Sequence, residues 1–372
     1  MGRRWLPPLL SVLVLLPMLD APLLVDERVQ FFEARKWIGL DPLAPWQLPL
    51  GGSGTWRPLT TWLFWLDAGA PRIVQHGAQI LAQAGLAAAV HRWLEARLSG
   101  PAALFGACVF ALHPAHVATG GWIGGRPDLA MALCATVALV AADRRRTLAA
   151  AALAAGAVLC KETAVVLPVL AWIAGARRRE VGAMAVAAGL LFVTAWIQAD
   201  VADSYRPGTG GLAIAALWGP VYGLEVLAPL FHPLALWGPS FALGVLAAGL
   251  LVRYRPPSWR PALFVGAALL PVAHVLPNDG GQWYLLLPSL GAAWWWGSVG
   301  RPRLLLPVLA VASLVTALQW REASQAVDAV LRSAESPADA PPAQDPRDWP
   351  HHGPSFCCGL PFQVFEPPPG SP

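Results

Sequence analysis

Long apolar runs recur from the N-terminus to about residue 319, and short clusters of arginine separate them. Each run is long enough, or nearly long enough, to cross a hydrocarbon core of roughly 30 Å. Charged residues make up only 13% of the chain, whereas soluble domains carry about 25%. The pattern therefore predicts an all-α protein, a polytopic transmembrane helical bundle of about eleven spans. The expected spans lie at about residues 6–19, 72–90, 101–112, 128–142, 147–160, 163–176, 181–197, 236–252, 261–276, 282–299 and 304–318.

The arginine clusters set the predicted orientation, because basic residues favour the cytoplasmic side of a membrane. These clusters are Arg3-Arg4, Arg92 with Arg97, Arg144 to Arg146, Arg177 to Arg179, Arg253 with Arg255 and Arg260, and Arg301 with Arg303. The basic residues behind the formal net charge of +4 thus mark the orientation in the membrane and form no single basic patch, so no nucleic-acid partner is expected. The N-terminus, interpreted as a retained first span, is expected in the cytoplasm and the C-terminus outside.

Residues 1–320 are expected to form the transmembrane domain, with residues 20–70 as the first extracytoplasmic loop. Aromatic residues interleave with charges in that loop, as in interfacial helices. Residues 211–233 are interpreted as an interfacial or re-entrant segment, because another crossing there would place the later arginines outside. Residues 321–372 contain a short amphipathic piece and then a Pro-rich stretch, a composition typical of a disordered tail.

The first candidate site is Asp26-Glu27, a few residues after the first span. Two carboxylates at the mouth of a membrane protein can act as a general base or hold a divalent metal such as Mg²⁺ or Mn²⁺. The alternative is an ordinary solvated start of the loop.

A second candidate is the turn that runs from His113 to Asp128 and carries His116 and Arg126. The Arg126 guanidinium suits bidentate binding of a phosphate. The two histidines could ligate a metal, although no third ligand is evident in the sequence. Helix capping and interface anchoring are the alternatives.

The pair Lys161-Glu162 interrupts an otherwise apolar helical hairpin. Each charge at membrane depth costs about 2.5–3.5 kcal/mol on insertion scales, so an ion pair, a phosphate contact or both are expected. His76, Gln79 and Gln83 recur at helical spacing and form a polar stripe, which either joins helices or lines a cavity.

Three cysteines of the apolar runs, Cys108, Cys134 and Cys160, stand singly in the sequence. A small apolar packing role is expected for each of them.

Together these motifs resemble a known family. They are Asp26-Glu27, Trp56-Arg57-Pro58-Leu59-Thr60, His113-Pro114-Ala115-His116, Trp122-Ile123-Gly124-Gly125-Arg126-Pro127-Asp128-Leu129, Cys160-Lys161-Glu162 and Tyr284-Leu285-Leu286-Leu287-Pro288-Ser289. In this order, over about residues 20–325, the chain is similar to the membrane core of the tetratricopeptide-containing transmembrane O-mannosyltransferases and their bacterial relatives, within the GT-C glycosyltransferase superfamily.

The resemblance implies a glycosyltransferase with a polyprenyl-phosphate-linked sugar as donor and a protein or glycan hydroxyl as acceptor on the extracytoplasmic side. It implies a catalytic carboxylate at Asp26, with Glu27 beside it, and donor-phosphate contacts from Arg57, Arg126 and Lys161. Supporting roles fall to His76, His113, His116, Asp128, Glu162 and Tyr284. High use of alanine, glycine, proline and arginine favours a bacterial cytoplasmic membrane as the location.

The chain departs from the family pattern at two places. Relatives often carry a glutamate where this chain has Ala118, and Glu-Arg where it has Gln282-Trp283. The tetratricopeptide repeats that usually follow the last span are also absent from this sequence. Two other functions therefore stay open. One is a transporter or flippase of lipid-linked saccharides, and the other is a diverged GT-C-like protein without activity.

Overall fold

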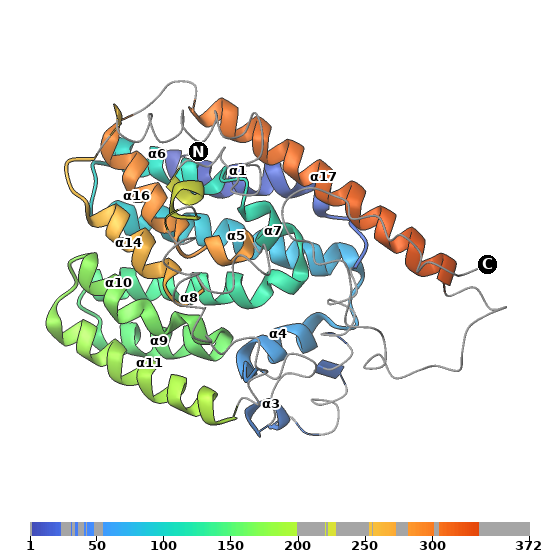
Figure 1. The fold of residues 1–372 in the computed structure, drawn as a ribbon, viewed down its shortest axis with the longest axis horizontal. Coiled ribbons are helices and arrows are strands. Elements are labelled where there is room, and N and C mark those ends of the chain that lie inside the picture. The colour runs from blue at the N-terminus through green and yellow to red at the C-terminus, as the bar shows by residue number, and fades with distance from the viewer. Residues whose placement is uncertain are drawn as a thin grey trace.

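A computed structural model describes residues 2–23, 31, 34–35, 41, 43–47, 55–198, 220, 222–227, 253–254, 256–272, 282–300 and 305–334. These residues form a bundle of helices, and no strand occurs among them. The all-α prediction is confirmed. Figure 1 shows the main helices packed side by side, with α3 and α4 gathered beyond the ends of α8 and α9.

The longer helices of the bundle have ten to thirty residues, and shorter helical segments lie between them. The N-terminal elements are η1 (Arg3–Trp5), α1 (Leu6–Leu15) and η2 (Leu16–Met18), followed by α3 (Ala44–Gln47) and α4 (Pro58–Asp67). Next come α5 (Arg72–Leu94), α6 (Gly100–Ala111), α7 (His116–Gly121), η3 (Ile123–Gly125), α8 (Arg126–Asp143), α9 (Thr147–Cys160), η4 (Glu162–Val166), α10 (Leu167–Ile173) and α11 (Arg178–Gln198). The last described elements are α14 (Arg260–Leu269), η7 (Gln282–Leu285), α16 (Ser289–Val299) and α17 (Leu305–Ala334).

Proline marks many of the helix starts. A proline occupies the first or second position of α1, α4, α6, α8, α10 and α14. There its fixed φ suits the helix and its missing N–H removes no hydrogen bond. The same prolines therefore break the apolar sequence into separate helices.

The helices α1, α5, α6, α8, α9 and α11 lie where spans are predicted. Helix α17 continues unbroken through residue 320 to Ala334, so the expected start of the tail lies inside a helix. Figure 1 shows the C-terminal part of α17 extending past the other helices. The predicted span at 236–252 and most of the segment 211–233 lie outside the described residues.

Among the described residues, two helical stretches are long and apolar enough to cross a membrane. They are Ile123–Asp143, with a mean hydropathy of 1.4, and Arg178–Gln198, with a mean hydropathy of 1.8. Four apolar helices of ten to seventeen residues accompany them: Gly100–Ala111, Thr147–Cys160, Glu162–Ile173 and Arg260–Leu269. The number of spans across the whole chain stays a prediction.

One end of the bundle collects the arginine clusters that lie within the described residues, and we call it the arginine end. Arg97, just after α5, forms a bidentate ion pair with Asp143 at the end of α8, with N···O distances of 2.7 and 2.8 Å. It also reaches the carbonyl oxygen of Ala174, just after α10, at 3.4 Å. The triplets Arg144 to Arg146 and Arg177 to Arg179 are exposed at the same end.

Close helix packing depends on small residues, and Gly106 of α6 shows this most clearly. A methyl group at Gly106 would overlap the backbone carbonyl oxygen of Ala293 in α16, which cannot rotate away. A methyl group added at Gly85 of α5 would meet no atom within 4 Å. The close approach of α6 and α16 therefore requires glycine at position 106.

We expect Gly106→Ala to lower the free energy of unfolding by about 1–3 kcal/mol, because it overpacks a backbone contact. The matched change Gly85→Ala meets no obstacle and raises helix propensity, so its effect should be neutral or stabilising by up to about 1 kcal/mol. Unfolding of both variants in detergent, followed by tryptophan fluorescence, measures the difference. Equal effects of the two changes would contradict the α6–α16 contact.

Candidate functional site

The opposite end of the bundle, which we call the site end, holds a compact ionic cluster. Helix α4 packs against α9 and α8 here. Arg57, at the start of α4, binds Glu162 in bidentate fashion. Its Nε donates to Oε2 at 3.0 Å and its Nη2 donates to Oε1 at 2.7 Å. The pair joins the loop before α4 to the turn after α9.

A second, deeper pair lies beside the first. The ammonium group of Lys161 donates to both carboxylate oxygens of Asp128, at 2.7 and 2.6 Å. The two side chains are only 3% and 5% exposed. The ring of Tyr284 also lies under this ammonium, with its centroid at 4.2 Å from Nζ. The motif of Tyr284 is thus brought to the turn between α9 and η4.

The backbone of Lys161 explains how two neighbouring charges reach different helices. Lys161 is extended, with φ −160° and ψ 129°, so α9 ends at Cys160 and a new helical turn begins at Glu162. The hydroxyl of Thr60 in α4 donates to the carbonyl oxygen of Cys160 at 2.8 Å and satisfies one of the carbonyls left free by the helix end. This break directs Lys161 to α8 and Glu162 to α4.

The four charges of Arg57, Asp128, Lys161 and Glu162 sum to zero and act on one another. Burial alone would raise the pKa of Glu162, but the Arg57 guanidinium beside it lowers that pKa to about 2. The carboxylate therefore stays ionised at neutral pH. Its side chain is 26% exposed, so this pair forms the accessible side of the cluster.

Arg126 lies in a separate ion pair at the far end of α4. Its Nη1 and Nη2 donate to the carboxylate of Asp67 at 2.8 and 2.9 Å, and Nη1 also donates to the carbonyl oxygen of Leu63 at 2.8 Å. The ring of Phe64 lies below the guanidinium, with its centroid at 5.0 Å. Because Arg57 precedes the first residue of α4 and Asp67 is its last, the two guanidinium sites are about 15 Å apart along the helix.

The two histidines of the next turn make internal contacts. The backbone N–H of Ala115 donates to Nδ1 of His113 at 3.2 Å, so the other ring nitrogen carries the proton and donates to the carbonyl oxygen of Val226 at 3.2 Å. Burial lowers the pKa of His113 to about 4, so the ring is neutral. Both of its nitrogens are thus engaged by protein groups rather than open to a metal.

His116 connects this turn to the motif of Tyr284. The hydroxyl of Ser289 donates to the carbonyl oxygen of Leu286 at 2.6 Å, so its oxygen accepts the proton carried by Nε2 of His116, at 2.7 Å. The His113 and His116 rings stack with centroids 5.1 Å apart. This serine is a hydrogen-bond acceptor for the histidine, which is not the arrangement of an activated nucleophile.

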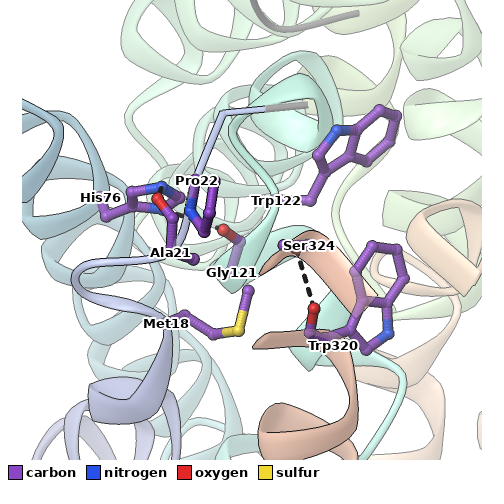
Figure 2. Close-up of a pocket in the computed structure, with 8 residues that line it drawn as sticks. All are labelled: Met18, Ala21, Pro22, His76, Gly121, Trp122, Trp320 and Ser324. Atoms are coloured by element: carbon purple, nitrogen blue, oxygen red, sulfur yellow. Dashed lines mark hydrogen bonds between the residues drawn. The ribbon is translucent and has the colours of Figure 1, made fainter. Parts of the chain in front are cut away.

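His76 lines a narrow crevice at the site end, shown in Figure 2. Its ring nitrogens face the carbonyl oxygens of Gly121, at 3.1 Å, and of Ala21, at 3.0 Å. Trp320 and Ser324 of α17 close the other side of this crevice. His76 therefore fastens the chain just after η2, at Ala21, to the end of α7 at Gly121.

The residues predicted for the site thus separate into groups. Arg57, Asp128, Lys161, Glu162 and Tyr284 come together, whereas Arg126, His76 and the two histidines of the turn form neighbouring contacts of their own. All three predicted phosphate-binding cations are ion-paired with carboxylates. Asp26, Glu27, Gln282 and Trp283 stay predictions, because the first two residues and the side chains of the last two lie outside what the structure describes.

Asp67 is an important residue that the sequence reasoning missed. Its signal was weak but present, since it is a single carboxylate that closes the apolar helix Pro58–Asp67. Such a charge usually has a partner. A metal at the site also stays a prediction: within the described ranges no group of three or more histidine, cysteine, aspartate or glutamate side chains is arranged to hold an ion.

Comparison with models of known protein families and with curated proteins gave no match for this chain.

Proposed function

We propose that this protein is an integral membrane glycosyltransferase that moves a sugar from a polyprenyl-phosphate donor to an acceptor hydroxyl at the extracytoplasmic face. One observation carries the proposal. The ionic cluster of Arg57, Glu162, Lys161 and Asp128 lies at the bundle end opposite the exposed arginines, and the first outer loop supplies α4 to it. The remaining support comes from the bundle surface and from the chemistry of these groups.

The exposed surface of the helices suits a lipid environment. In Arg178–Gln198 only 22% of the most apolar window is buried, although its mean hydropathy is 1.8. Leu190 and Ile197 on this helix, and Trp172 of the neighbouring α10, are 67–75% exposed. A core helix of a soluble protein would bury such side chains, whereas lipid is a favourable solvent for them.

The two ends of the bundle support the proposed orientation. Asp128, in the first turn of α8, and Asp143, its last residue, are fifteen positions apart, which corresponds to about 22 Å along the helix. Exposed arginines surround the Asp143 end, which the positive-inside rule places in the cytoplasm. The site end then faces the outside, together with the loop that carries Asp26 and Glu27.

The proposed reaction is an inverting displacement at the anomeric carbon. A carboxylate, Asp26 in our proposal, takes the proton of the acceptor hydroxyl as its oxygen forms the new glycosidic bond. The bond from the anomeric carbon to the phosphate oxygen breaks, and the lipid phosphate leaves with the electron pair. A cation must neutralise the charge that grows on this leaving group.

Arg57 is the best-placed cation for that task. Its partner Glu162 is 26% exposed, whereas Asp67 and Asp128, the partners of Arg126 and Lys161, are 16% and 5% exposed. A phosphate can therefore compete for Arg57 with the least disruption of buried structure. We assign Arg57 to the donor phosphate, and Arg126 and Lys161 to positioning α4 and the turn after α9.

We expect Arg57→Lys to raise the donor KM about tenfold, because lysine cannot reproduce a bidentate contact and one charge-assisted hydrogen bond is worth about 1.5 kcal/mol. Transfer rates at several concentrations of polyprenyl-phosphate sugar in membranes measure this. Arg97→Lys is the matched control, since it alters an equally bidentate pair at the arginine end. If both variants raised the donor KM equally, Arg57 would have only a structural role.

Labelled polyprenyl-phosphate sugar, supplied to proteoliposomes with the protein and a membrane extract as acceptor source, tests the function itself. Labelled acceptor in excess of protein-free vesicles supports a transferase. Movement of the donor between leaflets without transfer would indicate a flippase. Neither transfer nor donor binding would indicate an inactive GT-C-like protein.

A further inference from the structure

His76 of α5 lies between two backbone carbonyl groups from distant parts of the chain. Its Nδ1 is 3.1 Å from the carbonyl oxygen of Gly121, and its Nε2 is 3.0 Å from the carbonyl oxygen of Ala21. His76 is 1% exposed. Both distances are those of hydrogen bonds, and a carbonyl oxygen can only accept. Both hydrogen bonds therefore form together only when each ring nitrogen carries a proton.

The end of α7 needs donors from outside the helix. Helix α7 ends at Gly121, and the last carbonyl groups of a helix have no partner within it. Gln79, also on α5, meets the same need, because its amide nitrogen donates to the carbonyl oxygens of Thr119 at 2.6 Å and of Trp122 at 3.4 Å. One amide group thus serves two carbonyl oxygens without a charge, whereas a neutral imidazole has only one N–H.

The chain around Ala21 is also held from the side of α17. Met18 is 2% exposed and Ala21 is 1% exposed, and η2 packs against α17. Asp20 forms an ion pair with Arg321 of α17 at 2.9 Å. Residues 18–21, which we call the loop joint, are therefore held between α17 and the contact of α5 with α7.

The loop joint lies directly before the loop that carries the proposed base. Asp26 follows Ala21 by five residues, so the chain between them spans at most about 18 Å. A shift of the backbone at Ala21 is thus passed on to Asp26 over a short length of chain. A side chain that fixes Ala21 therefore limits where the carboxylate can lie.

We propose that His76 is a positioning residue for transfer, which fastens the loop joint to α7 and holds it more firmly when the ring is protonated. The neutral ring donates to one carbonyl oxygen and turns a lone pair toward the other, whereas the imidazolium donates to both. A joint that offers the ring two acceptors binds the proton more tightly than a joint from which Ala21 has moved away. The role in transfer rests on the proposed function, whereas the hold on Ala21 does not.

Several charged groups around the ring act on its protonation. Burial of the ring and the positive charges of Arg126 and Arg72 act against the second proton, whereas the two carbonyl partners favour it. Arg126 is itself paired with Asp67 of α4. On the side of α17, the charges of Asp20 and Arg321 offset each other. These groups together set the pH at which the ring gains its second proton.

The test compares three variants of the full chain in proteoliposomes with labelled polyprenyl-phosphate sugar. His76→Leu removes both contacts. His76→Gln supplies an amide group that can donate to two carbonyl oxygens at any pH, as Gln79 does. Gln83→Leu is the matched control, because Gln83 is 1% exposed on the same helix but lies about two turns from His76.

We expect His76→Leu to lower kcat about tenfold through the loss of hydrogen bonds that hold the loop joint. The donor KM should stay unchanged, because Arg57 binds the phosphate in our proposal. His76→Gln should retain a kcat within about threefold of the unsubstituted protein. A loss in Gln83→Leu equal to that in His76→Leu would overturn the positioning role and leave His76 a structural residue.

The pH profile tests the dependence on protonation. The ratio of the unsubstituted rate to the His76→Gln rate should rise several-fold as the pH falls from about 8 to about 5.5, because only histidine gains a donor in this range. Titration of Asp26 affects both proteins alike and cancels in the ratio. A constant ratio would overturn the dependence on protonation.

Amide hydrogen exchange tests the hold on Ala21 without reference to transfer. At one pH, the peptide that covers residues 16–23 should exchange faster in His76→Leu than in the unsubstituted protein or in His76→Gln. Equal exchange in all three proteins would overturn the hold. The expected difference in exchange, found together with an absence of transfer in every protein, would count against the glycosyltransferase and support the hold.

Discussion

Replacing Lys161 by methionine is expected to lower the free energy of unfolding by about 3–5 kcal/mol, because it leaves the carboxylate of Asp128 buried without its counter-ion. Asp128 is 5% exposed and both of its oxygens accept from Lys161. Methionine is an unbranched side chain of similar length, so it fills most of the space that the lysine stem occupies. The loss therefore reports the unpaired charge rather than a cavity.

The double variant Lys161→Met with Asp128→Val separates these effects. Removing both charges should restore most of the stability, since a buried ion pair and an apolar pair are often similar in free energy. Unfolding of the two single variants, Lys161→Met and Asp128→Val, and of the double variant in mixed detergent micelles, followed by tryptophan fluorescence, gives the three free-energy changes of the cycle. A double variant as unstable as Lys161→Met would contradict the assigned pairing.

An exposed ion pair provides the control for this cycle. Arg92 and Glu95 lie three residues apart at the arginine end, and the Arg92 side chain is 53% exposed. Arg92→Met should change stability by less than about 1 kcal/mol, because exposed pairs contribute little. A large effect there would mean that the method responds to charge in general.

Replacing Asp26 by asparagine is expected to lower the rate of transfer about 10²–10⁴-fold, the usual contribution of a general base. Asparagine keeps the size of the side chain but cannot accept the acceptor proton. The donor KM should stay nearly unchanged, because in our proposal Arg57 and not Asp26 binds the phosphate. Initial rates with labelled polyprenyl-phosphate sugar measure both quantities.

Asp41→Asn is the matched control in the same loop. Asp41 is exposed and accepts the backbone N–H of Leu43 at 2.8 Å, a local turn contact that has no expected part in transfer. Glu27→Gln shows whether the neighbouring carboxylate shares the role of Asp26. Undiminished transfer by Asp26→Asn would rule out the assignment of the base, and equal losses in Asp26→Asn and Asp41→Asn would indicate damage to the loop.

The sequence alone predicted most of the helices and the turns between them. The run Thr147–Cys160 was predicted and observed, and Lys161-Glu162 was predicted to lie at its turn. The prediction succeeded because apolar length, proline and charge act locally, on residues that follow one another in the chain. The described basic clusters gather at one end for a similar reason. Successive helices run antiparallel, so every second turn between them lies at the same end of the bundle, and the basic clusters occupy every second turn.

The partners of the charges were decided only by the tertiary structure. Nothing in the sequence around Arg126 distinguishes Asp67 from other carboxylates, and the partner of Lys161 is Asp128 of α8 rather than its neighbour Glu162. These contacts depend on which helices pack together and on their rotation and register. A buried charge must find a partner, but close packing of all the helices determines which partner lies within reach.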